Sequence, residues 1–226
     1  MSVALLADAH IGGPGGPAAP LVAQLEELAG ADCERLVLLG DLFQVWVASP
    51  RYETADVRRV VDALARLRSR GVALDYVEGN RDFFVAESEY AALFDRIATE
   101  VPFTAAGRRF LAVHGDGINP ADRQYRFWRW LSKSPPSRFL MRRLPTPLAR
   151  WVVHRTERSL ARTNFQHKVR IPEEAIVTYG RRRLREGYDA LLLGHFHEER
   201  RWTVAGGEIW LLDAWFASRR IERLPS

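Results

Sequence analysis

Two histidines separated by a single residue, His195 and His197, follow a run of apolar residues that ends at a glycine. This order is typical of a buried strand that ends in a loop carrying ligand side chains. The pair alone is weak support for a metal site, because His-x-His also occurs on surfaces and among hydrogen-bonded core histidines. Four earlier segments repeat the pattern, however, with polar ligand types directly after an apolar strand: Asp8-Ala9-His10, Gly40-Asp41, Gly79-Asn80-Arg81-Asp82 and His114-Gly115-Asp116.

The side chains at these strand ends have the composition of a binuclear metal centre. Two carboxylates, four imidazoles and one amide are too many ligands for one ion, and they suit two. A mixed nitrogen and oxygen set without thiolate favours Mn²⁺, Fe or Zn²⁺ over Ca²⁺ or a structural Cys-type zinc. Asp41 is the natural bridge, because one carboxylate can give an oxygen to each of two ions about 3.5 to 4 Å apart. The candidate ligands are Asp8, His10, Asp41, Asn80, His114, His195 and His197.

The hydrophobic periodicity predicts the elements that position these ligands. Strands alternate with helices, which indicates an α/β domain with helices outside the sheet. In such folds ligands gather at the carboxyl ends of the strands, where all five motifs lie. After a first strand before Asp8, we expect strands at 36–39, 73–77, 109–113 and before His195, helices at 21–29, 54–70, 87–98 and 172–185, and a hairpin of 202–204 with 208–212.

The regular spacing of the motifs breaks between His114 and His195, which predicts an insertion at 119–171 within one domain spanning 1–226. Prolines divide this insertion into short helices. Between residues 120 and 170 there are thirteen Arg or Lys against two acids, so the rest of the chain is acidic although the net charge is +5. The insertion also carries aromatic residues beside its arginines, among them Trp128, Trp130, Phe139 and Trp151. This composition suits a helix that lies at an anionic membrane surface or holds an acyl chain. It also suits a cap that packs its aromatics on the domain and solvates its arginines.

The overall composition narrows the class of protein. A chain of 226 residues with 47% hydrophobic residues is long enough to form one globular domain with a full core. The single cysteine, Cys33, forms no intramolecular disulfide and suits a reducing compartment. We see neither a secretory signal nor an apolar run that would span a bilayer. The sequence therefore predicts a cytoplasmic protein, or one attached to a membrane from that side.

The ordered series Asp-x-His, Gly-Asp, Gly-Asn-Arg-Asp, His-Gly-Asp and Gly-His-x-His resembles the calcineurin-like metallophosphoesterases over nearly the whole chain. The resemblance implies a metallophosphoesterase four-layer β-sandwich flanked by helices, here with an inserted helical cap. It implies that one ion is held by Asp8, His10, Asp41 and His197, and the other by Asp41, Asn80, His114 and His195. Asp82 and Asp116 would orient these ligands. The candidate catalytic residues are Asp41, Asn80, Arg81 and His114.

Arg81 departs from many members of the wider family, in which a histidine follows the asparagine and serves as a proton donor. An arginine holds its proton at working pH, so it can clamp an anionic oxygen but cannot protonate an alkoxide. The leaving group should therefore be one that leaves without a proton. A phosphate ester that leaves from a pyrophosphate meets that demand, whereas a simple alcohol does not.

Gly-Asn80-Arg81-Asp82-Phe, His114-Gly-Asp116 and the basic, aromatic insertion together resemble one branch, the UDP-2,3-diacylglucosamine diphosphatases. That branch hydrolyses a nucleotide-linked lipid A precursor to UMP and lipid X, and its helical cap covers the acyl chains. The resemblance implies two divalent ions, with Mn²⁺ expected, and a lipid-linked nucleotide as substrate. It also implies a peripheral location on the cytoplasmic face of the inner membrane. The expected substrate-binding residues are Asn80, Arg81, Asp122, Tyr125, Asn164, Lys168 and His195.

The sequence is also compatible with two alternatives. A basic segment with aromatics also suits a phosphodiesterase that acts on nucleic acid or nucleotides, although no stacking platform or groove-binding motif is present and we expect no nucleic-acid partner. The second alternative is a non-catalytic scaffold on the same fold. Every ligand position is filled, which favours an enzyme. The sequence indicates no obligate protein partner.

Overall fold

Two five-stranded sheets form the centre of the computed structural model, which describes residues 2–119, 123–145, 147–148, 151–153, 155 and 171–224. The first sheet has the order β12 (Glu222–Leu224), β1 (Ser2–Leu6), β2 (Cys33–Leu38), β4 (Ala73–Val77), β6 (Arg96–Ala98). The second has the order β10 (Arg200–Val204), β11 (Gly207–Leu211), β9 (Ala190–Leu193), β8 (Arg108–Val113), β7 (Glu100–Ala105). The central strands of each sheet are parallel, and β12, β10 and β7 are antiparallel edge strands.

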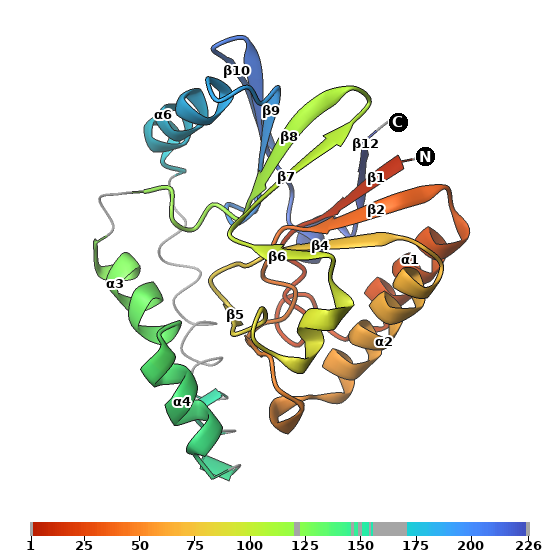
Figure 1. Ribbon diagram of the computed structural model, residues 1–226, viewed down its shortest axis with the longest axis vertical. Coiled ribbons are helices and arrows are strands. Elements are labelled where there is room, and N and C mark those ends of the chain that lie inside the picture. Colours follow the sequence, from red (N-terminus) through yellow and green to blue (C-terminus); the bar gives the residue numbers. More distant parts are fainter. Residues whose placement is uncertain are drawn as a thin grey trace.

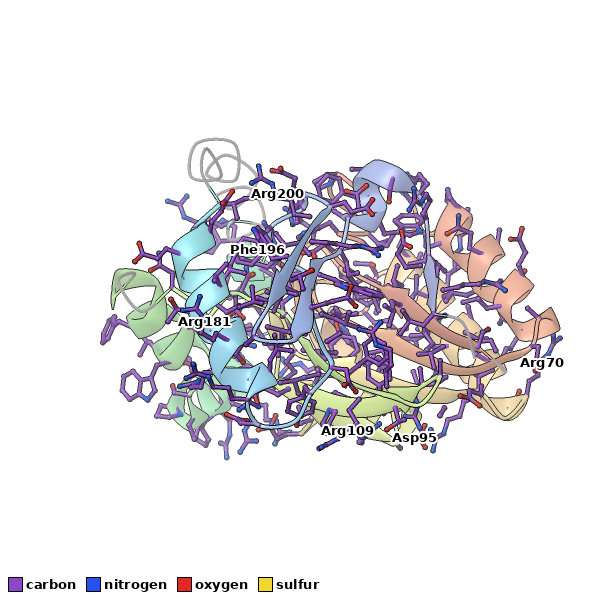
Figure 2. The ribbon with its side chains drawn as sticks, turned by 90° about the horizontal axis from the view of Figure 1, so that it is seen from above. Arg70, Asp95, Arg109, Arg181, Phe196 and Arg200 are labelled. Carbon is purple, nitrogen blue, oxygen red and sulfur yellow. The ribbon has the colours of Figure 1, made fainter. Side chains whose placement is uncertain are left out.

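Helices cover the outer face of each sheet, so the protein has four layers. On the first sheet lie α1 (Ala19–Gly30) and α2 (Ala55–Ser69), and on the second lies α6 (Glu173–Leu184) (Figure 1). Seen from above, Arg70, just after α2, and Arg181, on α6, lie at opposite sides of the molecule with the sheets between them (Figure 2). The four-layer α/β fold that the sequence predicts is confirmed.

Alternation along β1 shows how the apolar runs build these layers. Successive side chains of a strand point to opposite faces. Val3 and Leu5 join the core between the two sheets, whereas Ala4 and Leu6 pack in the core beneath α1 and α2. A strand that is buried on both faces is mostly apolar, with any buried charge paired, as Asp75 on β4 is with Arg96; this is why the ligand motifs follow largely hydrophobic runs.

One predicted helix is wrong. The segment 87–98 forms instead a short 3₁₀ helix, η2 (Glu89–Leu93), followed by strand β6. Asp95 and Leu74 exchange hydrogen bonds, and Arg96 binds the buried carboxylate of Asp75 on β4. These contacts add 96–98 to the edge of the first sheet, and pairing with a distant strand overrides the local helical pattern. The sequence also missed β7, α7 (Trp215–Ser218) and β12.

Two helices of the insertion, α3 (Arg123–Ser132) and α4 (Pro135–Arg143), lie along one side of the sandwich (Figure 1). Ser134 begins α4, because its hydroxyl accepts a hydrogen bond from the amide of Ser137. Two body residues hold the end of α4: Tyr52 donates to the carbonyl of Met141, and Arg51 donates to the carbonyls of Arg142 and Leu144. Within the described part of the chain, no helix is both long and apolar enough to cross a bilayer.

Candidate metal centre

The loops after β1, β2, β4, β8 and β9 bring the predicted ligands to one end of the sandwich. Five of these ligands have a left-handed backbone: φ is 50° at Asp8, 46° at His10, 52° at Asp41, 68° at His195 and 57° at His197. This conformation costs a non-glycine residue about 1 to 2 kcal/mol. Strain of this kind clusters at functional sites because the surrounding structure enforces it.

The first group of converging atoms belongs to Asp8, His10 and His197. The Nε2 atom of His197 lies 3.0 Å from Oδ1 of Asp8 and 3.3 Å from Nε2 of His10. Asp8 and His10 are buried, and the side chain of His197 is 14% exposed. Two imidazole nitrogens and a carboxylate oxygen around one point form a donor set suited to a divalent cation.

The second group contains Asp8, Asp41 and His114, and Asn80 lies beside it. The Nδ1 atom of His114 lies 2.7 Å from the carbonyl oxygen of Leu39. A carbonyl only accepts hydrogen bonds, so Nδ1 carries the proton and Nε2 of the neutral ring presents a lone pair. That lone pair faces Oδ1 of Asn80 at 3.1 Å and Oδ1 of Asp41 at 3.7 Å. Three electron-pair donors that face one another need a proton or a metal cation between them, so the arrangement fits a metal.

Asp41 lies between the two groups. Its Oδ1 is 3.7 Å from Nε2 of His114, and its Oδ2 is 3.8 Å from Nε2 of His10. The two oxygens of this carboxylate therefore face histidines of different groups, which suits a bridging ligand. Asp8 also belongs to both groups, a feature that the sequence pattern does not indicate.

His195 is placed differently from the other histidines. Its backbone amide donates to Oδ2 of Asp8 at 2.7 Å, and its ring lies 5.1 Å from the ring of His114 in an edge-to-face arrangement. Its ring is not one of the donors in either converging group. The structure thus brings His195 to the site, beside the second group.

Arg81 and Asp82 contact the loop of Asp41 in different ways. The guanidinium of Arg81 is buried, donates to the carbonyl of Gln44 at 3.0 Å and has Nε 3.4 Å from Oδ2 of Asp41. The Oδ2 atom of Asp82 accepts hydrogen bonds from the amides of Asp41 at 2.9 Å and Gly79 at 2.8 Å. Asp82 therefore ties together the loops that carry Asp41 and Asn80.

Burial and mutual charge shift the pKa values of the cluster in different directions. Burial disfavours charge on Asp8, but the neighbouring imidazoles of His197, His10 and His114 outweigh it and hold the Asp8 pKa well below its usual range. Burial lowers the pKa of His10. Burial also disfavours the charged form of His114, yet the carboxylates of Asp41 and Asp8 raise its pKa. Burial, and then the charge of Asp41, raise the pKa of Asp82 to about 7.

Glycine is required where backbone and ligand approach each other closely. A Cβ atom at Gly79 would lie 2.3 Å from Oδ1 of Asp41, and one at Gly194 would lie 2.7 Å from Oδ2 of Asp8. The glycines of the Gly-Asn and Gly-His motifs therefore leave room for the carboxylates of other motifs.

Phe216, on α7, is a site residue that the sequence analysis missed. Its ring packs edge-to-face against His197, with centroids 4.8 Å apart, and against His10 at 5.4 Å. The amides of Trp215 and Phe216 donate to the carbonyls of Ala7 and Asp8, which places α7 beside the end of β1. No motif marks Phe216, because only the return of the C-terminal segment brings it to the histidines.

Four predicted substrate contacts cannot be placed. Asp122, Asn164 and Lys168 lie outside the described residues, as does the side chain of Tyr125, although its backbone belongs to α3. The roles assigned to them stay predictions.

No family model matches the chain. UDP-2,3-diacylglucosamine hydrolase of Chromohalobacter salexigens is 33% identical over 103 residues, 45% of this chain and 42% of the relative. That of Edwardsiella ictaluri is 30% identical over 166 residues, 73% and 63% of the two chains. That of Xanthomonas campestris pv. campestris is 27% identical over 228 residues, 92% and 87% of the two chains. The chain thus spans less than two thirds of the length of the first two relatives.

Two solved structures are similar to the chain at lower sequence identity. A structure described as a novel archaeal phosphodiesterase has a TM-score of 0.49 and 11% identity, and it covers 99% of both chains. Vps29 of Entamoeba histolytica complexed with Zn²⁺ has a TM-score of 0.47 and 15% identity, with 95% of this chain and 74% of that one covered.

The ordered motifs and the four-layer fold resemble those of the calcineurin-like metallophosphoesterases. In sequence the chain is similar to the UDP-2,3-diacylglucosamine hydrolases. Its converging carboxylates and imidazoles are candidate ligands for divalent cations.

Proposed function

We propose that the protein hydrolyses the pyrophosphate of UDP-2,3-diacylglucosamine to UMP and 2,3-diacylglucosamine 1-phosphate in lipid A biosynthesis. The names of the relatives supply the substrate. The observation that best supports a binuclear centre is the position of Asp41, which has one oxygen facing His10 and the other facing His114.

We assign one cation to Asp8, His10, Asp41 and His197, and the other to Asp41, Asn80, His114 and His195, with Mn²⁺ expected at both. When bound, two divalent cations lower the pKa of a water nucleophile and polarise the phosphoryl oxygens for in-line attack. The chain supplies the orientation: His114 is fixed by its Nδ1–H bond to Leu39, and the loops of Asp41 and Asn80 are joined through Asp82.

Arg81 restricts the reaction to leaving groups that need no proton. Its guanidinium stays protonated and donates hydrogen bonds without acting as an acid. Attack at the α-phosphorus expels the lipid 1-phosphate, a phosphate monoester that leaves as an anion. A pyrophosphate substrate therefore matches Arg81 better than an alkyl phosphodiester does.

A pocket of about 290 Å³ lies between the metal-ligand loops and the insertion, with an apolar part and a polar part that includes Glu53 and Asp56. Ile11 follows His10, Phe43 and Val45 follow Asp41, and Val153 belongs to the insertion. The apolar part of this pocket suits an acyl chain whose head group lies at the metal centre. This supports residues 119–171 as a cap over a lipid substrate.

The exposed surface of the insertion is both apolar and basic. Every exposed large hydrophobic side chain of the described residues belongs to the insertion: Phe127, Trp130, Leu131, Phe139, Leu140, Leu148 and Trp151. Arg143 lies over the ring of Phe139, 5.1 Å from its centroid. Exposed aromatics beside arginines favour an interface with anionic lipid. We therefore propose peripheral association with the cytoplasmic face of the inner membrane.

An assay of the Mn²⁺-supplemented protein on UDP-2,3-diacylglucosamine tests this function, with products identified by phosphorus NMR and mass spectrometry. In ¹⁸O-labelled water, attack at the α-phosphorus should place the label in UMP. Single-stranded DNA and cyclic nucleotides are run beside the lipid. Cleavage of either one without lipid turnover would reject the lipid substrate and favour a phosphodiesterase.

A further inference from the structure

Two cationic side chains one helical turn apart, Arg129 in α3 and Lys133 just after it, contact the loops of two predicted metal ligands. The Nε atom of Arg129 donates to Oδ2 of Asp116 at 2.6 Å, and Nζ of Lys133 donates to the carbonyl oxygen of Gly79 at 2.7 Å. Residues four apart on a helix lie on one face. A single face at the end of α3 therefore contacts both loops.

These contacts lie immediately beside the ligands. Gly79 precedes Asn80, and Asp116 follows His114 by two residues. The carboxylate of Asp116 is 4% exposed, and the side chain of Arg129 is 27% exposed, so water screens this ion pair less than a surface pair.

Lys133, in the insertion, holds the peptide group between Gly79 and Asn80 by donating to the carbonyl of Gly79. On the other side of Gly79, Asp82 accepts from its amide at 2.8 Å. Rotation of that peptide would break the Lys133 hydrogen bond and move the side chain of Asn80. The two loops meet where Oδ1 of Asn80 lies 3.1 Å from Nε2 of His114.

We propose that Arg129 and Lys133 are positioning residues that hold the Asn80 and His114 half of the metal centre in place from the insertion. They touch neither the proposed cations nor the reacting atoms, and they act through the orientation of the two loops. The inference rests on the metal centre of the proposed function but not on its lipid substrate.

The direction in which metal affinity changes when Lys133 is removed separates this positioning role from simple charge repulsion. An ammonium or guanidinium group near a cation site repels the cation. If charge alone mattered, removing Lys133 would strengthen metal binding. If Lys133 orients Asn80, its removal weakens binding at the second group and leaves the Asp8, His10 and His197 group unchanged.

The test is calorimetric titration of Mn²⁺ into the metal-free protein and its Lys133→Met, Lys133→Arg and Arg129→Met variants. We expect Lys133→Met and Arg129→Met to weaken one of two binding events by about tenfold or more, the range for loss of an outer-shell partner. Lys133→Arg keeps a donor and should retain most of the affinity. Arg138→Met is the matched control, because it breaks another contact between insertion and body, the 3.2 Å ion pair with Glu87, away from both ligand loops.

Thermal unfolding checks that each variant is folded. If Lys133→Met does not fold, Arg129→Met and Lys133→Arg still test the proposal. Unchanged or tighter binding in folded Lys133→Met and Arg129→Met, or an equal loss in Arg138→Met, would overturn the positioning role. Two Mn²⁺ sites in a protein without lipid turnover would reject the proposed substrate only. A wild-type protein that binds no Mn²⁺ would overturn both proposals.

Discussion

Nε2 of His114 faces Oδ1 of Asn80 at 3.1 Å, and the hydrogen bond from Nδ1 to the carbonyl of Leu39 leaves Nε2 of the neutral ring without a proton. Two electron-pair donors therefore point at each other in a buried site. Either a proton or a metal cation must lie between them. Burial disfavours the imidazolium of His114, but the carboxylates of Asp41 and Asp8 raise its pKa and so favour a proton there when no cation is bound.

Metal binding should therefore depend on pH through His114. Its pKa is raised, so the imidazolium persists to a higher pH than that of an ordinary histidine. Below that pKa a cation must displace the proton, and its affinity should fall about tenfold per pH unit. Above it, affinity should level off. Calorimetry of Mn²⁺ binding in buffers of different ionisation enthalpy measures the proton released. His114→Asn should abolish this dependence, and an unchanged pH profile in that variant would exclude His114 as the group.

Asp41→Asn should remove hydrolysis while the fold survives. The substitution keeps the shape of the side chain but removes the charge and one ligand oxygen from the residue between the two histidine groups. We expect kcat/KM to fall by more than about 100-fold, beyond the loss of an outer-shell partner. His10→Ala should behave similarly. Steady-state kinetics with an activated phosphodiester, with circular dichroism as the fold check, measures both. Wild-type turnover in either variant would remove the binuclear centre from the mechanism.

Gly79→Ala should displace the bridging carboxylate. The added Cβ would lie 2.3 Å from Oδ1 of Asp41 and 2.8 Å from its amide nitrogen, so the loop must move. Overpacking of this kind costs about 1 to 3 kcal/mol. We expect lower stability in urea and weaker Mn²⁺ binding. Gly30→Ala is the control, because a Cβ there meets no atom within 4 Å. Equal behaviour of the two variants would contradict the steric account.

The exposed aromatics of the insertion should affect binding of the lipid substrate and not the rate of phosphodiester hydrolysis. Replacing Trp130, Phe139 and Trp151 by serine removes side chains that are 67%, 62% and 53% exposed. We expect weaker sedimentation with anionic vesicles and a higher KM for the lipid substrate. Hydrolysis of a small activated phosphodiester should stay within about twofold, since surface substitutions seldom disturb a fold. An equal loss on both substrates would argue against a lipid-binding surface.

The sequence by itself determined the ligand types, their order and their places after buried strands. A strand buried on both faces is mostly apolar, so each polar residue that follows such a run at a strand end stands out. The glycines beside Asp41, Asn80 and His195 are part of the same local pattern. The class of fold follows because strands alternate with helices along the chain.

Only the tertiary structure decided which side chains meet. Strand β6 forms because Asp95 and Arg96 bind β4, against a local helical pattern. Phe216 reaches His10 and His197 because the C-terminal segment returns beside β1, and Lys133 reaches Gly79 across 54 residues of chain. Contacts between distant segments leave no periodic trace in a sequence, because packing selects them after the local elements are set.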